Sequence, residues 1–508
     1  MELSWGMNWS VMAPGMLLAI VQWMWSGAAS PHSIRVKARV TPEGAVIRLA
    51  VDSTADFATP LYSMVDTVSS VTDQVVDLPV AGLTPDSRYH YVLEINGALD
   101  TTMAGSFRTP AEAPESFTLA MGSCARTGST HEVFNLIRSL DPLIFLHLGD
   151  FHYENIAVAD VQPYRLAIRT VLASEPQAHL YRSIPIAYMW DDHDYGPNNG
   201  DSTAPGRTQA RQTYREYIPH YPLAAGTGDV GIYQSFSIGR TRFILTDSRS
   251  LRSPYTVPDS PSKTMLGAAQ KAWFKRELMA ARDTYALIVW VNTLPWIGVT
   301  GDDGWYAYTF EREEIANFIV DSGITGLCMI SGDAHMLAID DGSHSNYSSR
   351  PGAGFPVLHA AALDQSGSIK GGPYSEGAFP GGGQFGLMQV TDTGDSMVVN
   401  WSGRDYLNIE RVAFRFATSG ACVVSFTGDI NESGMITASD IIALVNFVFR
   451  SGTEPAPCTA AGDADCNGAV SSQDIVSLVS FVFKGGPRPC NVCRLIPGIW
   501  NCPNGSAG

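Results

Sequence analysis

Side chains that can bind a metal ion stand at the ends of several hydrophobic runs in this chain of 508 residues. They carry thiol, phenol, amide, imidazole or carboxyl groups and are Cys124, Asp150, Tyr153, Asp191, Asp192, His193, Asp194, Asp247, Asn292, Asp333 and His335. A polar residue often ends a strand as part of a turn, but open α/β sheets also build their sites beyond the carboxyl ends of their strands. The recurrence predicts a metal-dependent hydrolase site along one edge of a sheet.

Several of these residues also have a simpler interpretation. Cys124 alone would more often be a small buried hydrophobic residue than a ligand. Tyr153 and Asn292 would more often serve in turns or packing, and Asp247 could cap a helix. The remaining histidines that we interpret as structural or exposed are His131, His152, His220, His344 and His359.

Apolar runs separated by helix-like stretches surround these residues from Ser116 onward. Strands are expected at 117–121, 143–148, 184–189, 243–245, 286–291 and 326–330, and helices at 131–140, 268–282 and 312–321. Strands that alternate with helices favour βαβ units, and continuous apolar runs favour strands covered on both faces. A second sheet is expected from 356–361, 385–390 and 396–401. The predicted class is α/β, with a layered sandwich as the core.

The segment 31–112 is predicted to be a separate all-β domain. Residues 34–40 and 88–95 alternate between apolar and polar side chains, with the period of two that half-buried strands show. The stretch from Leu83 to Tyr91 resembles a corner of a fibronectin type III or immunoglobulin-like sandwich, in which a tyrosine hydroxyl caps a turn. No residue in this domain suggests catalysis.

The composition argues against a protein that binds the nucleic-acid backbone. The chain has 50 acidic and 33 basic residues, a formal charge of −17 and 45% hydrophobic residues. A phosphate backbone attracts basic surfaces, whereas an acidic chain suits a soluble, cation-binding protein. The length suggests two to four domains.

The N-terminal segment 1–30 resembles a secretory signal. Residues 11–25 are apolar except for interruptions at Pro14, Gly15 and Gln22, and the small residues 26–30 resemble a cleavage site. The run is short for a membrane span, and no basic residue precedes Arg35. Export to a secreted, periplasmic or cell-surface location is expected, with an uncleaved anchor or a misassigned start as alternatives.

Six of the eight cysteines lie near the C-terminus, which favours disulfides in an oxidising compartment over a zinc site. They are Cys422, Cys458, Cys466, Cys490, Cys493 and Cys502, the last two lying in a tail of residues 491–508. Cys458 and Cys466 lie near each other in the sequence and are a candidate pair. The core cysteines Cys124 and Cys328 stand apart.

Residues 426–490 contain a repeat with a period of 34 residues, whose two copies follow the pattern of a calcium loop. Calcium requires several oxygen donors around a tight turn, and glycine at position 6 permits that turn. The expected ligands are Asp429, Asn431, Ser433, Met435, Thr437 and Asp440 in the first loop, and Asp463, Asp465, Asn467, Ala469, Ser471 and Asp474 in the second. An apolar helical stripe follows each loop.

The core motifs resemble the alkaline phosphatase D group of metallophosphatases, also called PhoD-like. They are Gly122-Ser123-Cys124, Gly149-Asp150-Phe151-His152-Tyr153, Trp190-Asp191-Asp192-His193-Asp194, Asp247-Ser248-Arg249 and Ser331-Gly332-Asp333-Ala334-His335. The resemblance implies a four-layer metallophosphatase sandwich flanked by helices over 113–418. It also implies a phosphoric ester hydrolase that uses a metal-bound hydroxide.

The same resemblance implies two unlike metal positions that share Asp150. Ferric iron would be bound by Cys124, Tyr153 and His335 together with Asp150. Calcium, or another divalent ion such as magnesium or manganese, would be bound by Asp192, Asn292 and Asp333, all oxygen donors. Cys124 and Asp333 depart from the general metallophosphatase pattern in the manner of this group, which argues against a common di-zinc or di-manganese site.

The catalytic residues that the resemblance implies are Asp150, His193, Arg126 and Arg249. His193 would contact the phosphate and protonate the leaving oxygen. Arg126 and Arg249 would hold substrate oxygens, because a guanidinium group matches a phosphate bidentately.

The two C-terminal loops resemble a type I dockerin, in which one helix follows each calcium loop. Aspartate at position 12 suits a stabilising calcium ion better than a switch. The resemblance implies a cohesin-like or scaffold partner, with a calcium-stapled cap as the alternative. We therefore expect an exported phosphomonoesterase or phosphodiesterase, monomeric and without a transmembrane core. The alternatives are an enzyme of phospholipase type on larger esters and a non-catalytic surface binding protein.

Overall fold

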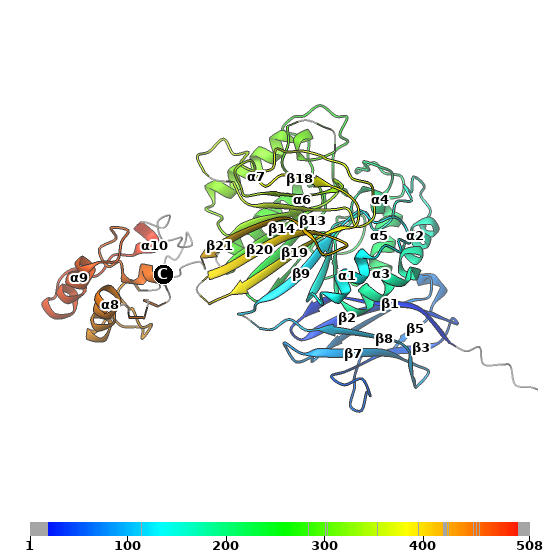
Figure 1. Cartoon of the computed structure of the whole chain (residues 1–508), viewed down its shortest axis with the longest axis horizontal. Coiled ribbons are helices and arrows are strands. Elements are labelled where there is room, and N and C mark those ends of the chain that lie inside the picture. Colours follow the sequence, from blue (N-terminus) through cyan, green and yellow to red (C-terminus); the bar gives the residue numbers. More distant parts are fainter. Residues whose placement is uncertain are drawn as a thin grey trace, which may run out of the picture.

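The computed structural model describes residues 19–495 except 113, 283, 300, 302, 353, 395, 420–423, 425, 451, 454 and 457 (Figure 1). Two mixed sheets pack against each other in the centre, and their side chains share one hydrophobic core. Phe117 of one sheet contacts Phe243 of the other, with ring centroids 6.3 Å apart. The predicted mixed α/β class is confirmed.

The first central sheet has nine strands. Their order is β21 (Glu410–Ser419), β20 (Ser396–Asp405), β19 (Gln384–Asp392), β9 (Phe117–Gly122), β10 (Ile144–His147), β11 (Ile186–Tyr188), β1 (Ile20–Ser30), β2 (Ser33–Thr41) and β6 (Val75–Ala81). Strands β9, β10 and β11 run parallel, so their carboxyl ends meet at one edge.

The second central sheet has seven strands. Their order is β12 (Gln234–Ile238), β13 (Thr241–Thr246), β14 (Leu287–Asn292), β15 (Leu327–Ser331), β17 (Val357–Ala360), β16 (Met336–Asp340) and β18 (Ala378–Pro380). Strands β13, β14 and β15 are again parallel, and every residue of β14 and β15 is buried. This burial on both faces explains why these segments show no alternation in the sequence.

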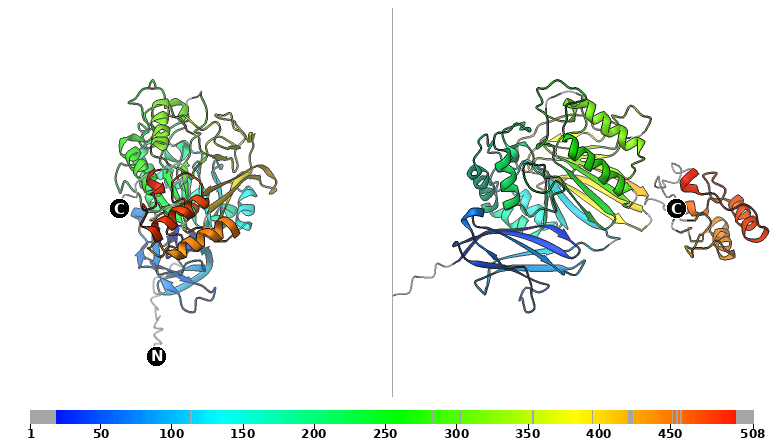
Figure 2. Two further views of the ribbon diagram at one scale, coloured as in Figure 1. Left: turned by 90° about the vertical axis from the view of Figure 1, so that its left-hand side faces the viewer. Right: turned by 180° about the vertical axis from the view of Figure 1, so that it is seen from behind.

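Helices cover the outer faces of both sheets, as Figure 2 shows from two further sides. The helices that pack on the first sheet are α1 (Val133–Ser139), α2 (Val161–Ala173), α3 (Glu175–Ser183) and α5 (Arg207–Tyr217). Helices α6 (Gly267–Arg282) and α7 (Thr309–Asp321) pack on the second sheet. None of the helices among the described residues is long and apolar enough to cross a membrane.

The expected second sheet of 356–361, 385–390 and 396–401 is wrong as a grouping. β17 lies in the seven-stranded sheet, whereas β19 and β20 pair with β9 and with each other in the nine-stranded sheet. Apolar periodicity gives the strand but not its partner, because pairing is decided by tertiary contacts.

The expected signal-like segment 1–30 also needs correction. Residues 20–30 form strand β1, which pairs along its length with β2 and contacts β11 through Gly27. Trp23, Met24 and Trp25 are buried, and Trp25 Nε1 donates to the carbonyl of Tyr217. The apolar run is thus a core strand from Ile20 onward, and cleavage within 26–30 would cut into the fold. Residues 1–18 lie outside the described residues.

The N-terminal unit is all-β but is not separate from the core. Strands β1, β2 and β6 continue the nine-stranded sheet and face a five-stranded sheet across a common hydrophobic core. The strands of this smaller sheet are β3 (Val46–Asp52), β4 (Leu61–Tyr62), β5 (Asp66–Thr67), β7 (Arg88–Ile95) and β8 (Ala98–Arg108). At the expected corner, the hydroxyl of Tyr89 accepts a 2.9 Å hydrogen bond from the backbone of Thr84.

The C-terminal unit contains two loop–helix repeats followed by a short helix. Helices α8 (Ala438–Arg450) and α9 (Ser472–Lys484) pack together around Leu444 and Leu478, which are fully buried. Helix α10 (Val492–Leu495) packs through Val492 against Val424 and Ala460. Figure 1 shows this unit beyond the end of β21.

Candidate metal centre

The predicted site residues meet at the carboxyl edge of the two central sheets. Cys124 follows β9, Asp150 follows β10, and Asp333 follows β15, while Asn292 is the last residue of β14. Asp192 begins α4 (Asp192–Tyr195), the short helix after β11. Because the strands within each set are parallel, their ends place these side chains at the same edge.

Three of the proposed ligands have a left-handed backbone. The φ angle is +63° at Cys124, +54° at Asp150 and +72° at Asp333. This conformation is unfavourable for residues with a Cβ and clusters at functional sites in proteins. Neighbouring turns hold it here, since Cys124 N donates to Gly149 O at 3.2 Å and Ala125 N donates to Asp150 O at 3.1 Å.

Gly149 allows the turn before Asp150 to pack against the turn after β11. Its φ is +89°, and a Cβ there would lie 2.5 Å from Asp191 Cβ and 2.6 Å from Asp191 N. Asp194 then anchors the next turn, because its Oδ1 accepts from Phe151 N at 2.7 Å and its Oδ2 accepts from Asp191 N at 3.0 Å. The turn at Asp150 and the turn at Asp192 are therefore held in a fixed position relative to each other.

The first ligand group brings together Cys124, Asp150 and His335, whose donor atoms all lie within 4.8 Å of one another. The Tyr153 hydroxyl lies 2.8 Å from Asp150 Oδ2 and 3.0 Å from His335 Nε2. His335 Nδ1 donates to the carbonyl of Ser366 at 2.7 Å, which leaves Nε2 with its lone pair toward the site. One thiol, one phenol, one imidazole and one carboxyl group thus converge.

The second ligand group also contains Asp150, here with Asp192 and His193. Asn155 Oδ1 accepts from His193 Nδ1 at 2.9 Å, so the Nε2 of the neutral ring carries the lone pair. The ring of His193 packs on that of Tyr153, with centroids 4.1 Å apart. Asp150 is the residue common to both groups, as expected of a bridging carboxylate.

Two buried oxygens support the presence of a cation at this place. Asp150 Oδ1 and Asn292 Oδ1 accept no hydrogen bond from the described residues. Leaving a buried acceptor without a partner costs about 1–3 kcal/mol, and coordination of a cation would satisfy both oxygens. Asn292 Nδ2, by contrast, donates to Leu294 O at 2.6 Å, which turns Oδ1 to the other side.

Asp333 is at the site but has a partner that sequence reasoning missed. Lys370 Nζ lies 2.7 Å from Asp333 Oδ1 and 2.9 Å from its Oδ2. Lys370 belongs to the glycine-rich segment 364–377, which has no periodic pattern that would have marked it. Asp333 belongs to neither ligand group but contacts Cys124, whose Sγ lies 3.5 Å from Asp333 O.

The predicted substrate contact of Arg249 is not supported by the structure. Arg249 is fully buried, and its Nε donates to Asp191 Oδ1 at 2.6 Å. Its two Nη groups donate to Asp303 at 3.0 and 3.1 Å. Arg252 also pairs with Asp303. The guanidinium group of Arg249 therefore belongs to a buried network of ion pairs that stabilises the site.

Arg126 lies at the rim of the site. Its side chain is 68% exposed, and Asp364 orients it by accepting from Nη2 at 2.9 Å through its carboxylate and from Nε at 3.0 Å through its carbonyl. This placement leaves Arg126 accessible to a substrate. Asp247 is instead a turn residue, whose carboxylate accepts from Trp190 Nε1 and from the backbone N–H groups of Ile232, Arg249 and Ser250.

Burial raises the pKa of the three acidic members of the first ligand group, Cys124, Tyr153 and Asp150, and lowers that of His335. Desolvation and the nearby Asp150 charge raise the pKa of Cys124 and of Tyr153. Desolvation and the charge of Asp192 likewise raise the pKa of Asp150. Without a cation these three acidic groups therefore hold their protons, and a bound cation would favour their anionic forms.

The pKa values of Asp333 and Asp192 are shifted in opposite directions. Burial raises the pKa of Asp333 to about 7, although Lys370 opposes the shift. Burial acts in the same sense on Asp192, but the charge of Arg249, 3.8 Å away, holds its pKa below the usual value. Burial also lowers the pKa of His193, so its ring is neutral near pH 7.

The two C-terminal loops share one internal hydrogen-bond pattern. In each, the carboxylate at position 1 accepts from the backbone at positions 5 and 6, and Asp440 and Asp474 at position 12 accept from the backbone at positions 3 and 9. Gly434 and Gly468 at position 6 have φ angles of +81° and +88°. Asp463, Asp465 and Asp474 bring donor atoms within 4.8 Å of one another.

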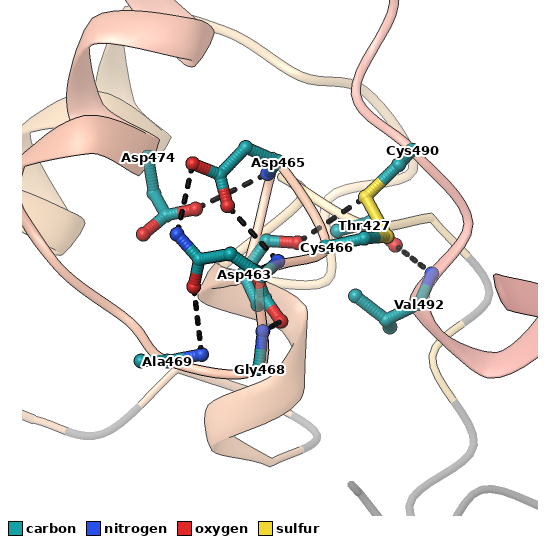
Figure 3. Close-up of a disulfide and its surroundings, with 10 residues drawn as sticks. Thr427, Asp463, Asp465, Cys466, Gly468, Ala469, Asp474, Cys490 and Val492 are labelled. Carbon is teal, nitrogen blue, oxygen red and sulfur yellow. Dashed lines mark hydrogen bonds between the residues drawn. A yellow bond between two sulfur atoms is a disulfide. The ribbon is translucent and has the colours of Figure 1, made fainter. Parts of the chain in front are cut away.

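The disulfide at the second loop differs from the candidate pair. Cys466, at position 4 of that loop, is bonded to Cys490, 24 residues further on, and Figure 3 shows this bond beside the carboxylates of Asp463 and Asp465. Cys458 and Cys493 each take part in a further disulfide. Cys124 and Cys328 are free and buried. Proximity in the sequence misled here, because Cys490 returns to the loop only after helix α9.

Comparison with known proteins points to one family. Residues 119–367 match the model of the PhoD-like phosphatase family. Alkaline phosphatase D of Bacillus subtilis (strain 168) is 22% identical over 311 residues, which are 51% of this chain and 53% of that protein. The chain thus spans about half the length of this curated relative.

A solved structure of PhoD has the same fold. It superposes with a TM-score of 0.66 and covers 78% of this chain and 90% of that chain, at 17% sequence identity. The fold of the central sheets and their helices is therefore shared with that structure.

Proposed function

We propose that the chain is a metal-dependent phosphoesterase of the PhoD-like phosphatase family, a family of phosphoric ester hydrolases whose model residues 119–367 match. The observation that carries the proposal is the position of Asp150, which belongs to both ligand groups of the site. A carboxylate between two cation positions suits a two-metal site, which can stabilise the attacking and leaving oxygens of phosphate ester hydrolysis.

We propose that the two positions prefer different metals. Cys124, Tyr153 and His335 would bind ferric iron together with Asp150, because thiolate and phenolate donors suit a highly charged ion. Asp150, Asp192, Asn292 and Asp333 would bind calcium, or magnesium or manganese, through oxygen. When bound, the ions would screen the phosphate oxygens and lower the pKa of a coordinated water.

The chain's own residues would orient the ester and move protons. His193, held by Asn155, stands beside both Asp150 and Asp192 and would exchange a proton with the leaving oxygen. Because its ring is neutral near pH 7, the acid role requires that the negatively charged substrate raise its pKa. Arg126, exposed at the rim, would bind a phosphate oxygen.

The flanking units would place the enzyme outside the cell. The N-terminal sandwich is proposed as a fibronectin III-like spacer, and the two C-terminal loops as a dockerin-like calcium module with a cohesin-like or scaffold partner. The bond between Cys466 and Cys490 suits an oxidising compartment such as the periplasm, the cell surface or the medium, as do the disulfides in which Cys458 and Cys493 each take part.

Hydrolysis assays on the purified full chain test this function. A chromogenic phosphomonoester and a phosphodiester are offered at neutral and alkaline pH, before and after chelation and again after adding iron and calcium. We expect hydrolysis that chelation abolishes and metal restores. Cleavage of the diester alone would select the phosphodiesterase class, whereas hydrolysis of neither ester would leave the non-catalytic binding protein.

A further inference from the structure

The ammonium group of Lys370 lies within the proposed metal centre. Both carboxylate oxygens of Asp333 contact Nζ, and Asp303 Oδ2 is 3.9 Å away. Asp303 itself is already paired with Arg249 and Arg252, so Asp333 provides the closer and otherwise uncompensated charge. The Lys370 side chain is 33% exposed, which gives it a path away from the site.

The segment that carries Lys370 touches the site at several points. Ser366 O accepts from His335 Nδ1, and Ser368 Oγ accepts from His335 N at 3.2 Å. Beyond Lys370 the chain turns through Gly371 and Gly372, whose φ angles are +70° and +97°. Lys370 is therefore held on one side by contacts with His335 and followed on the other by a turn that favours glycine.

We propose that Lys370 is a tethered cation that neutralises Asp333 when the second metal position is empty and leaves it when a divalent ion binds there. The inference rests on the proposed function, because it requires Asp333 to be a ligand of the second ion. An ammonium group and a divalent ion repel each other strongly at the contact distances of one carboxylate. Occupation by the ion therefore requires that Lys370 withdraw from at least one Asp333 oxygen.

This exchange explains why a buried carboxylate beside Asp192 and Asp150 has a lysine as its partner. A buried charge without a partner is unfavourable, and Lys370 removes that cost in the metal-free protein. The same contact competes with the metal, so Lys370 lowers the affinity of the second position. Removal of the lysine charge should tighten metal binding there.

Amine labelling of the full chain tests the exchange without measuring activity. The chain, freed of metal by chelation, is treated briefly with an amine-acetylating reagent with and without calcium chloride, and the Lys370 peptide is quantified by mass spectrometry. We expect calcium to speed the acetylation of Lys370 at least about fivefold, the lower end of typical coupling between two ligands. Lys271 of α6, which pairs with Glu314 of α7, should label at an unchanged rate.

Three variants separate the possible causes. In Asp333→Asn, Lys370 should label fast with or without calcium, because its partner is gone. In Asp463→Ala, which damages only the second C-terminal loop, the calcium response of Lys370 should remain. In Lys370→Met, calorimetry should show at least about fivefold tighter calcium binding in the core.

The outcomes distinguish this inference from the proposed function. If elemental analysis finds a second ion in the core but calcium leaves the labelling of Lys370 unchanged, the exchange is refuted and the metal centre stands. If the core binds no second ion in the wild type or in Lys370→Met, both proposals fail. A response that disappears in Asp463→Ala would assign it to the C-terminal loop and overturn the exchange.

Discussion

The hydroxyl of Tyr153 lies 2.8 Å from Oδ2 of Asp150, three residues earlier in the same turn. The turn joins these residues because Asp150 has a left-handed φ of +54° and Asp194 accepts from the backbone of Phe151 between them. A phenol and a carboxyl group at this separation can bind one cation together. The contact is therefore the local basis for the proposed iron position.

Tyr153→Phe should remove the colour of the iron-loaded protein. A phenol that coordinates ferric iron is deprotonated and gives a visible charge-transfer band, which a phenyl ring cannot give. Absorption spectra of the two iron-loaded proteins measure this, and Tyr406→Phe, at an exposed tyrosine, is the matched control. An unchanged band in the Tyr153 variant would show that this residue does not bind the iron.

Arg249→Met should destabilise the fold by about 3–5 kcal/mol, because it leaves buried carboxylates without their partner. Arg249, Asp191 and Asp303 have side chains that are 0%, 0% and 6% exposed. Urea denaturation measures the change in the free energy of unfolding. Arg207→Met, which removes a partly exposed pair with Asp229, should cost no more than about 1 kcal/mol. Equal effects of the two substitutions would contradict the proposed stabilising role of Arg249.

Glu115→Gln should stabilise the protein at alkaline but not at acidic pH. Burial raises the pKa of Glu115 to about 7 in the folded state, above the ordinary glutamate value. The folded state therefore binds the proton more tightly, and the charge destabilises the fold increasingly as the pH rises toward 7 and fully above it.

Thermal unfolding of wild type and Glu115→Gln at pH 4 and pH 8.5 tests this dependence. We expect a gain of about 1–3 kcal/mol at pH 8.5 and almost none at pH 4. Glu112→Gln, at a carboxylate that is 70% exposed, provides the control and should show no such pH dependence. A gain for Glu115→Gln of the same size at both pH values would refute the pKa argument.

The bond between Cys466 and Cys490 should strengthen calcium binding in the second loop alone. It fixes position 4 of that loop, whereas the first loop has Glu432 there without a cross-link. Replacing both cysteines by serine leaves every proposed ligand in place but adds an ordering cost of about 1–2 kcal/mol.

Calcium titration by calorimetry on the full chain measures this effect, and the first loop is an internal control. We expect about tenfold weaker binding in the second loop and unchanged binding in the first. Equal weakening of both loops would indicate general damage to the C-terminal unit instead.

The proposed ligands of the site were easier to find in the sequence than the residues around them. Cys124, Asp150, Asn292 and Asp333 each follow or end a continuous apolar strand, and that pattern is visible without a structure. Lys370 was missed because its segment has no periodicity and its partner, Asp333, is 37 residues away. The substrate contact was assigned to Arg249 from its motif. A motif reveals the residue type but not that the guanidinium group already pairs with Asp191 and Asp303.

The strands were likewise easier to predict than their pairing. Residues 20–30 have the composition of a signal segment, and only the partners β2 and β11 make them a core strand. The sheet membership of β17 and β19 depends on contacts with strands that are distant in the sequence. Hydrophobic periodicity carries no information about such partners.

Asp150→Asn tests the central claim, that one carboxylate serves both cation positions. Iron and calcium bound to the core are measured by elemental analysis of the full chain, together with hydrolysis of a phosphomonoester; Asp321→Asn, on the exposed end of α7, is the control. We predict that the Asp150 variant loses both core ions and its activity, while the control and the calcium of the C-terminal loops remain unchanged. Retention of both core ions with full activity would contradict the account.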